Sequence, residues 1–304
     1  MAEQSRGGQS PGLLTTPPRQ IDPYTSDSRG IYQPPTPVEH RDEEYPSEGF
    51  DALAAMQRDH FWYRGRHRFI LHFTRRMASL MRASSALDAI DLGGGCGGWV
   101  NYLERHEPGV FRLALADSSA LALDLARPFV SPQVTRYQID LLNLQWSSRW
   151  DLAFMLDVLE HIPDDIRALQ QVRAALRPGG FLITTTPALE RFRTPIDDMS
   201  RHVRRYSRAD LVARAATAGL ELVTTRYFMF FLSPLLLLSR RHIPDPSQLT
   251  PAEIREYMRK SAEIPPAPLN AALSMVFALE TPLGAWLPFP WGTSVLAVFR
   301  RPST

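Results

Sequence analysis

The stretch that decides the fold is Asp91-Leu92-Gly93-Gly94-Gly95-Cys96-Gly97-Gly98. The apolar run 86–92 that leads into it predicts a strand, and the segment 98–106 that follows predicts a helix. A strand that turns at once into a helix needs glycines, because they allow the turn and let a ligand approach the backbone. The spacing Gly93-x-Gly95-x-x-Gly98 matches the dinucleotide fingerprint, but a tight bend without a ligand produces the same pattern.

Outward from this turn, apolar runs alternate with helical segments. Strands are expected at 111–116, 134–139, 152–156, 181–186, 220–227 and 294–300, and helices at 120–127, 163–176 and 208–218. Ser118 is the expected N-cap of the helix 120–127. Strands that alternate with helices imply a parallel sheet built by right-handed crossovers. The fold class is therefore α/β, with a Rossmann-like, doubly wound sheet.

Acidic residues follow four of these strands: Asp91, Asp117, Asp140 and Asp157. Ligands of such sheets bind at the carboxyl ends of the strands, so these side chains predict a site. A carboxylate at Asp117 can accept both ribose hydroxyls of an adenosine, in NAD or in S-adenosylmethionine. Asp140 could accept from an adenine amino group.

Taken together, the motifs resemble those of class I S-adenosylmethionine-dependent methyltransferases of the bacterial small-molecule and lipid-modifying type. The matching segments, in the expected order, are Asp91 to Gly97, Leu115-Ala116-Asp117, Asp140-Leu141, Leu156 to Ile162 and Leu176-Arg177-Pro178-Gly179-Gly180. The resemblance implies a seven-stranded sheet whose last strand is antiparallel, with S-adenosylmethionine as the cofactor. The run of three glycines before Cys96 makes a looser loop than is usual in that family.

The resemblance also implies a cofactor site. Its residues would be Gly93, Gly95 and Gly97 around the methionine part, Asp117 at the ribose, Asp140 with Leu141 at the adenine, and Asp157 near the sulfonium, with Asp91, Ser118 and Val158 adjoining them. The upstream run 60–66 resembles a segment that lies over the cofactor in many such enzymes. There Trp62 could cover an apolar face and Arg66 could pair with the methionine carboxylate. Alternatively, the run is an amphipathic helix whose aromatic side chains enter the core.

Methyl transfer needs a base only when the acceptor is a hydroxyl or a protonated amine. The candidate catalytic residues are His161, after the fourth strand, and His202, in the charged run 197–206. Each has an alternative interpretation, a loop anchor for His161 and a solvated, ion-paired loop for His202. Cys96 is expected to fill space in the loop, and no metal site is expected.

Composition divides the chain into four parts. We expect a disordered Pro-rich tail at 1–46, N-terminal helices covering the cofactor at 47–85, the methyltransferase domain at 86–227 with 294–304, and a helical apolar insertion at 228–293. Within the insertion, helices are expected at 251–261 and 269–279. We expect the insertion to form the acceptor side of the site or a lid, with Phe230 and Phe231 at the acceptor. A self-contained helical subdomain is the alternative.

Net charge and cysteine content limit the classes of partner and the compartment that we expect for this protein. The net charge of +2 over 304 residues gives no preference for nucleic acid, and the single cysteine excludes an intrachain disulfide and suits the cytoplasm. The expected acceptor is a small or lipid-linked molecule methylated on O or N, with peripheral membrane contact through 228–293 as an option. One alternative is an NAD(P)-dependent oxidoreductase, although this chain has no evident catalytic Tyr-x-x-x-Lys pair and Lys260 is its only lysine. The other alternative is a non-catalytic S-adenosylmethionine-binding module.

Overall fold

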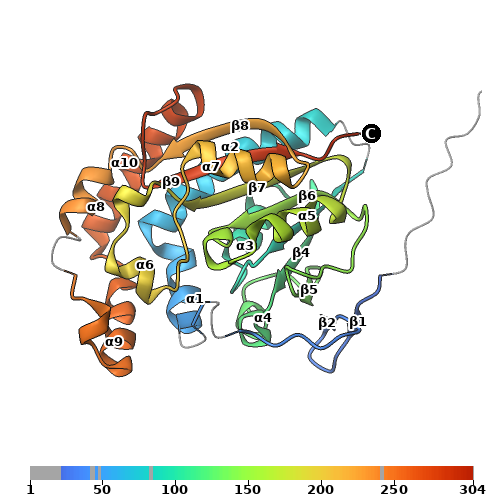
Figure 1. Ribbon diagram of the computed structural model, residues 1–304, viewed down its shortest axis with the longest axis horizontal. Helices are drawn as coiled ribbons and strands as arrows, with labels where there is room; N and C mark the ends of the chain where they lie inside the picture. Colours follow the sequence, from blue (N-terminus) through green and yellow to red (C-terminus); the bar gives the residue numbers. More distant parts are fainter. Residues whose placement is uncertain (1–21, 42–44, 47–48, 82–84, 240–242, 304) are drawn as a thin grey trace, which may run out of the picture.

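A mixed sheet runs through the centre of the molecule (Figure 1). The structure is a computed structural model that describes residues 22–41, 45–46, 49–81, 85–239 and 243–303. The strands are β1 (Thr25–Ser26), β2 (Ile31–Gln33), β3 (Leu87–Leu92), β4 (Phe111–Asp117), β5 (Thr135–Gln138), β6 (Trp150–Leu156), β7 (Leu176–Pro187), β8 (Glu221–Phe228) and β9 (Ser294–Arg300).

Helices cover both faces of this sheet. They are α1 (Phe50–Asp59), α2 (Phe61–Met81), α3 (Gly98–His106), α4 (Ala120–Ala126), α5 (Asp165–Ala175), α6 (Pro195–Met199), α7 (Arg208–Thr217), α8 (Ser233–Ser239), α9 (Pro251–Ser261) and α10 (Ala267–Trp286), with short 3-10 turns η2 (Leu159–His161), η3 (Glu190–Phe192) and η4 (Pro246–Gln248). Helix α5 begins at Asp165 rather than at Pro163, because the Asp164 side chain caps it by accepting from the Arg167 amide.

The order of the strands confirms the predicted fold class. It is β1-β2-β5-β4-β3-β6-β7-β9-β8, with β3 through β7 parallel and β9 antiparallel to both of its neighbours. The chain order reverses between β3 and β6, so the switch point lies beside the glycine loop. Seven of the nine strands among the described residues are those of the expected sheet, and β1 and β2 extend its edge.

Strands β1 and β2 correct the prediction of a disordered tail. The Ile31 side chain is fully buried, and β2 pairs with β5 in parallel. Tyr24 stacks on Trp146, with ring centroids 4.5 Å apart, and is itself buried. The sequence does not predict β2 because prolines follow it, and because the partners of Ile31 and Tyr24 lie about a hundred residues away in sequence. The rest of the expected tail, residues 1–21 and 42–44, lies outside the described residues.

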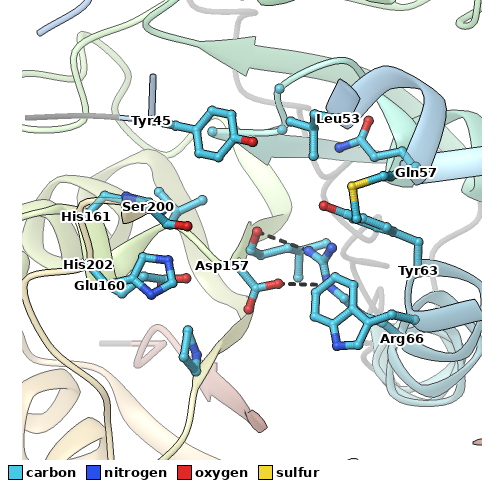
Figure 2. A pocket seen from close by; sticks show the side chains of 18 of the residues that line it. Tyr45, Leu53, Gln57, Tyr63, Arg66, Asp157, Glu160, His161, Ser200 and His202 are labelled. Carbon is cyan, nitrogen blue, oxygen red and sulfur yellow. Dashed lines mark hydrogen bonds and ion pairs between the residues drawn. The ribbon is translucent and has the colours of Figure 1, made fainter. Parts of the chain in front are cut away.

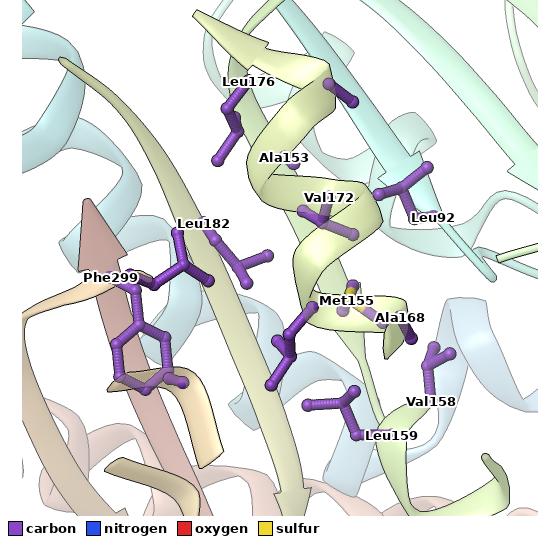
Figure 3. Close-up of a cluster of buried hydrophobic side chains, with 14 of the residues drawn as sticks. Leu92, Ala153, Met155, Val158, Leu159, Ala168, Val172, Leu176, Leu182 and Phe299 are labelled. Atoms are coloured by element: carbon purple, nitrogen blue, oxygen red, sulfur yellow. The ribbon is translucent and has the colours of Figure 1, made fainter. Parts of the chain in front are cut away.

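The two faces of the sheet hold separate apolar layers. On one face α5 and α7 pack on Met155, Leu182 and Phe299, as Figure 3 shows for α5. On the other face α2 and α3 pack on alternate residues of the same strands, such as Phe154 and Ile183. Because the central strands are parallel and both faces are covered, their carboxyl ends lie together at one edge of the sheet.

The insertion packs against helix α2 rather than standing apart. Helix α10 is longer than expected and lies along α2, where the Phe277 ring occupies the space beside Gly65. The Asn270 side chain accepts from the Phe61 amide, and the buried Glu280 carboxylate accepts from the amides that begin the insertion, at Phe230 and Phe231. Helix α10 is therefore fixed to α2, and the first residues of the insertion are fixed to α10.

The outer face of α10 is apolar and open to solvent. Its exposed side chains include Met275, Leu279, Leu283 and Trp286, the last of which is 81% exposed. Among the helices that the structure describes, none combines the length and hydropathy that a bilayer crossing requires.

Candidate functional site

One cavity of about 570 Å³ lies at the carboxyl ends of β3, β4, β6 and β7, walled by α1, α2 and the segment around α6. We distinguish its glycine-loop end, formed by Asp91, Gly93 to Gly95, Asp117, Ser118, Ile139 and Leu141, from its histidine end, formed by Glu160, His161, Asp197, His202 and Arg205. In Figure 2 Asp157 lies between Arg66 on one side and the histidine end on the other.

The glycine loop has a backbone that only glycine adopts readily. Gly93, Gly95 and Gly97 have φ values of 73°, 56° and 77°. A Cβ on Gly93 would also lie 2.7 Å from Val158, which lines the cavity. Gly97 does not line the cavity; it precedes α3 and packs near Val130 and Leu115. The loop therefore presents backbone to the cavity at Gly93 and Gly95, and Gly97 serves the turn into α3.

Asp117 ends β4 with its carboxylate at the cavity. Its Oδ2 accepts from the Gly95 amide and its Oδ1 from the Ser119 amide, each at 2.9 Å. The expected cap of α4 is corrected: the Ser119 side chain, not Ser118, accepts from the Ala122 amide. Ser118 instead lines the cavity and its hydroxyl bonds Nδ1 of His40 at 2.8 Å. These bonds tie the glycine loop to the end of β4.

Asp140, which was predicted to bind the adenine together with Leu141, does not line the cavity. Asp140 turns away from it, pairing with Arg41 at 2.8 Å and accepting from the Leu142 amide. Its side chain borders a separate cavity of about 330 Å³, whereas Leu141 lines the main one. The structure therefore gives the Asp140 carboxylate a different partner from the predicted adenine, because the N-terminal segment, expected to be disordered, supplies Arg41.

Arg66 and Asp157 form an ion pair across the cavity floor. Nε of Arg66 lies 3.1 Å from Oδ2 of Asp157, and the guanidinium also donates to the Leu156 carbonyl. Trp62 lines the cavity and lies 5.0 Å from that guanidinium. The expected pairing of Arg66 with a methionine carboxylate is thus replaced by an internal pair. Phe61 and Trp62 both line the cavity, and Phe61 also packs in the apolar layer on that face of the sheet. The run 60–66 is therefore part of a helix whose aromatic side chains enter the core, and its place over a cofactor stays a prediction.

Asp91 is a buried carboxyl without a complete set of partners. It is 2% exposed, and its Oδ1 has no hydrogen-bond partner among the described residues. Burial raises the pKa of Asp91 to about 7, with Arg66 opposing and Asp117 adding to that rise. A cationic group of a ligand would restore the interactions that this carboxylate lacks.

This pKa predicts how stability depends on pH. Because the folded pKa of Asp91 lies above its ordinary value of 3.8, its contribution to the free energy of unfolding is full below about pH 4 and is lost as pH rises through 7. The ligand-free protein should lose about 1–4 kcal/mol over that range, and Asp91→Asn should not. Thermal melts at pH 5 and pH 8.5 measure the difference, with the exposed Asp124→Asn as control. Equal pH dependence in wild type and Asp91→Asn would contradict the assignment.

The histidine end is built around Asp197, which the sequence analysis missed. Its buried carboxylate bonds Nδ1 of His202 at 2.8 Å and accepts two bonds from Arg205. Burial alone would raise the pKa of Asp197, but the His202 hydrogen bond and the Arg205 charge outweigh it and hold the pKa well below its usual value. Asp197 therefore orients the His202 ring, and the spacing of five residues across a charged run was its only sequence signal.

His161 and Glu160 complete this end. The His161 ring lies 4.8 Å from that of His202, and burial lowers its pKa to about 3, which keeps the imidazole neutral. Glu160 is fully buried, and burial together with Asp157 raises its pKa well above the usual value. Glu160 was part of the quoted motif, but nothing in its sequence position showed that it would be buried.

The insertion reaches the cavity through residues other than those expected. Leu236 of α8 and Tyr257 and Ser261 of α9 line it. Phe230 does not: it stacks on Phe289, with ring centroids 4.7 Å apart, and Phe231 is 43% exposed. Neither of these phenylalanines lines the cavity, because both pack against Phe289 within the insertion.

Comparisons with known proteins agree with this geometry. Two solved structures share the fold: the provisionally assigned sarcosine dimethylglycine methyltransferase of Galdieria sulphuraria (17% identity, TM-score 0.53, covering 78% of this chain and 86% of that one) and a provisionally assigned Haloferax volcanii methyltransferase in complex with its activator (19%, 0.52, 83% and 97%). A comparison with curated proteins finds no match. A family model described as a methyltransferase domain matches residues 56–225. The chain belongs to this methyltransferase family, and it is a class I methyltransferase that uses S-adenosylmethionine as its cofactor, not a nicotinamide-dependent oxidoreductase.

Proposed function

We propose that this enzyme methylates a hydroxyl oxygen of a small acceptor that is partly apolar. The observation that carries the proposal is the cavity of about 570 Å³, whose glycine-loop end and histidine end adjoin at Asp157. S-adenosylmethionine supplies a methyl group already activated on a sulfonium. What remains for the protein is to hold donor and acceptor in line and to manage the proton of the acceptor.

The glycine-loop end fits the cofactor. We assign the backbone at Gly93 and Gly95 and the unpartnered carboxyl of Asp91 to the methionine part, whose ammonium is a cation. Asp117, ending β4 in the cavity, would accept the ribose hydroxyls, with Leu141 beside the adenine. A side chain on Gly93 would collide with Val158 and would block the approach of the cofactor to the backbone there.

The histidine end favours an oxygen acceptor. Methyl transfer to a hydroxyl releases a proton, so the oxygen must be activated, whereas an uncharged amine can react without such help. Two imidazoles and a carboxyl side by side are groups suited to activating a hydroxyl. Among the nitrogen and oxygen acceptors that the sequence allows, this cluster supports oxygen.

Apolar walls suit an acceptor with a hydrocarbon part. Ile162, Ile196, Leu236 and the Tyr257 ring line the cavity between the histidine end and the insertion. Leu236 belongs to α8, whose Leu235 and Leu238 side chains are exposed to solvent. A lipid-linked acceptor would meet this surface first, and peripheral membrane contact through the insertion stays a prediction.

Exchanging one leucine of α8 tests the acceptor side. In Leu236→Ser the acceptor KM should rise about tenfold, because a pocket methylene is worth roughly 1–3 kcal/mol, while affinity for S-adenosylhomocysteine stays unchanged. Labelled methyl transfer to long-chain alcohols and phenols measures the first quantity, and calorimetry the second. Leu238→Ser is the matched control, since that leucine is 56% exposed on the same helix. Equal KM values in the two variants would place the acceptor elsewhere.

A further inference from the structure

The carboxylate of Glu160 lacks a counter-charge. It is fully buried, and neither oxygen has a hydrogen-bond partner among the described residues. The two guanidinium groups nearby are engaged, Arg66 with Asp157 and Arg205 with Asp197. Burying a carboxylate without a partner is costly unless a proton or a cation accompanies it. Its surroundings therefore leave a place for a positive ion.

Two imidazoles lie beside this carboxylate. Ligand atoms of Glu160, His161 and His202 all lie within 4.8 Å of one another, and all three residues line the cavity. In a tetrahedral site with ligands about 2.1 Å from the ion, the ligand atoms lie about 3.4 Å apart, so the three side chains would have to approach one another by up to about 1.4 Å to close the set. Nδ1 of His161 is also buried without a partner among the described residues.

The orientation of His202 is that of a metal ligand. Histidines that bind metals usually donate their other ring N–H to a carboxylate, which fixes the tautomer. Here Asp197, held by Arg205, accepts from Nδ1 of His202 at 2.8 Å and leaves the Nε2 lone pair free to face a ligand. The arrangement is thus a ligand triad with its supporting carboxylate already in place.

We propose that Glu160, His161 and His202 bind a divalent transition-metal ion, with Zn²⁺ as the first candidate. Two imidazoles and one carboxylate suit Zn²⁺, Mn²⁺ or Co²⁺ better than Mg²⁺ or Ca²⁺, which prefer all-oxygen sets. Three protein ligands leave positions open toward the cavity, as in catalytic sites. An ion there would lie at the histidine end, where we place the acceptor, and would favour the ionised form of the acceptor's hydroxyl.

Ion binding is measured on the full chain without cofactor or acceptor. After chelator treatment, calorimetry should show one Zn²⁺ bound per chain, and Co²⁺ should give visible absorption bands that report its coordination. Glu160→Gln and His202→Gln should each weaken Zn²⁺ binding by about 100-fold or more, and Asp197→Asn by roughly 10- to 100-fold. The matched controls are Glu263→Gln and His106→Gln, whose side chains lie outside the cavity.

The outcomes separate this proposal from the proposed function, on which only the role of the ion rests. Thermal melting checks that each variant is folded. If Glu160→Gln does not fold, the Zn²⁺ affinity of His202→Gln tests the site. Absence of Zn²⁺ and Co²⁺ binding to the wild type overturns the metal site, as does equal affinity in wild type and both ligand variants. Either result leaves hydroxyl methylation standing, with an imidazole as the base. Conversely, tight ion binding without turnover of any hydroxyl acceptor would refute the proposed function and keep the site.

Discussion

The His202→Ala variant is expected to lower kcat by about 10²- to 10⁴-fold, the usual contribution of a positioned proton-transfer group. Nδ1 of His202 is held by Asp197, so Nε2 is the polar atom that faces the acceptor end. The loss follows whether Nε2 takes the proton of the hydroxyl or holds the proposed ion. Initial rates with labelled S-adenosylmethionine and saturating acceptor measure it.

Cofactor binding separates this effect from misfolding. S-adenosylhomocysteine should bind His202→Ala with wild-type affinity, because the glycine-loop end does not include His202. The control His106→Ala changes a histidine that lies outside the cavity and bonds the Tyr102 carbonyl, and its kcat should equal that of the wild type. A folded His202→Ala protein with unchanged kcat across the pH range would remove His202 from the acceptor site.

The Asp117→Ala variant is expected to bind S-adenosylhomocysteine about tenfold to hundredfold more weakly. Charge-assisted hydrogen bonds of the kind that we assign to the ribose hydroxyls are worth about 1.5–3 kcal/mol. The same carboxylate also accepts the Gly95 amide, so its removal loosens the glycine loop as well. Calorimetric titration with S-adenosylhomocysteine gives the affinity directly.

Two further variants resolve these contributions. Asp117→Asn keeps one acceptor oxygen and the size of the side chain, so its affinity should fall less than that of Asp117→Ala. Asp124→Ala removes an exposed carboxylate of α4 that pairs with Arg29, outside the cavity, and should leave the affinity unchanged. Wild-type affinity in a folded Asp117→Ala protein would mean that the cofactor does not use the end of β4.

The sequence alone determined the elements whose causes are local. The apolar run before Asp91, the glycines after it and the acidic residues at the ends of the next three strands predict the sheet, its switch point and the glycine-loop end. Strand β9 and helix α9 begin and end where the pattern places them. Both His161 and His202 were chosen from their motifs, and both line the cavity.

The tertiary structure alone decided which charges meet. Arg41 turns Asp140 out of the cavity, Asp157 occupies the guanidinium of Arg66, and Glu160 is left buried without a counter-charge. The positions of α10 along α2 and of β2 beside β5 are decided the same way, by the Phe277 ring at Gly65 and by the buried Ile31. The reason is physical: periodicity and turn chemistry act over a few residues, whereas an ion pair or a buried ring depends on what the fold brings from a hundred residues away.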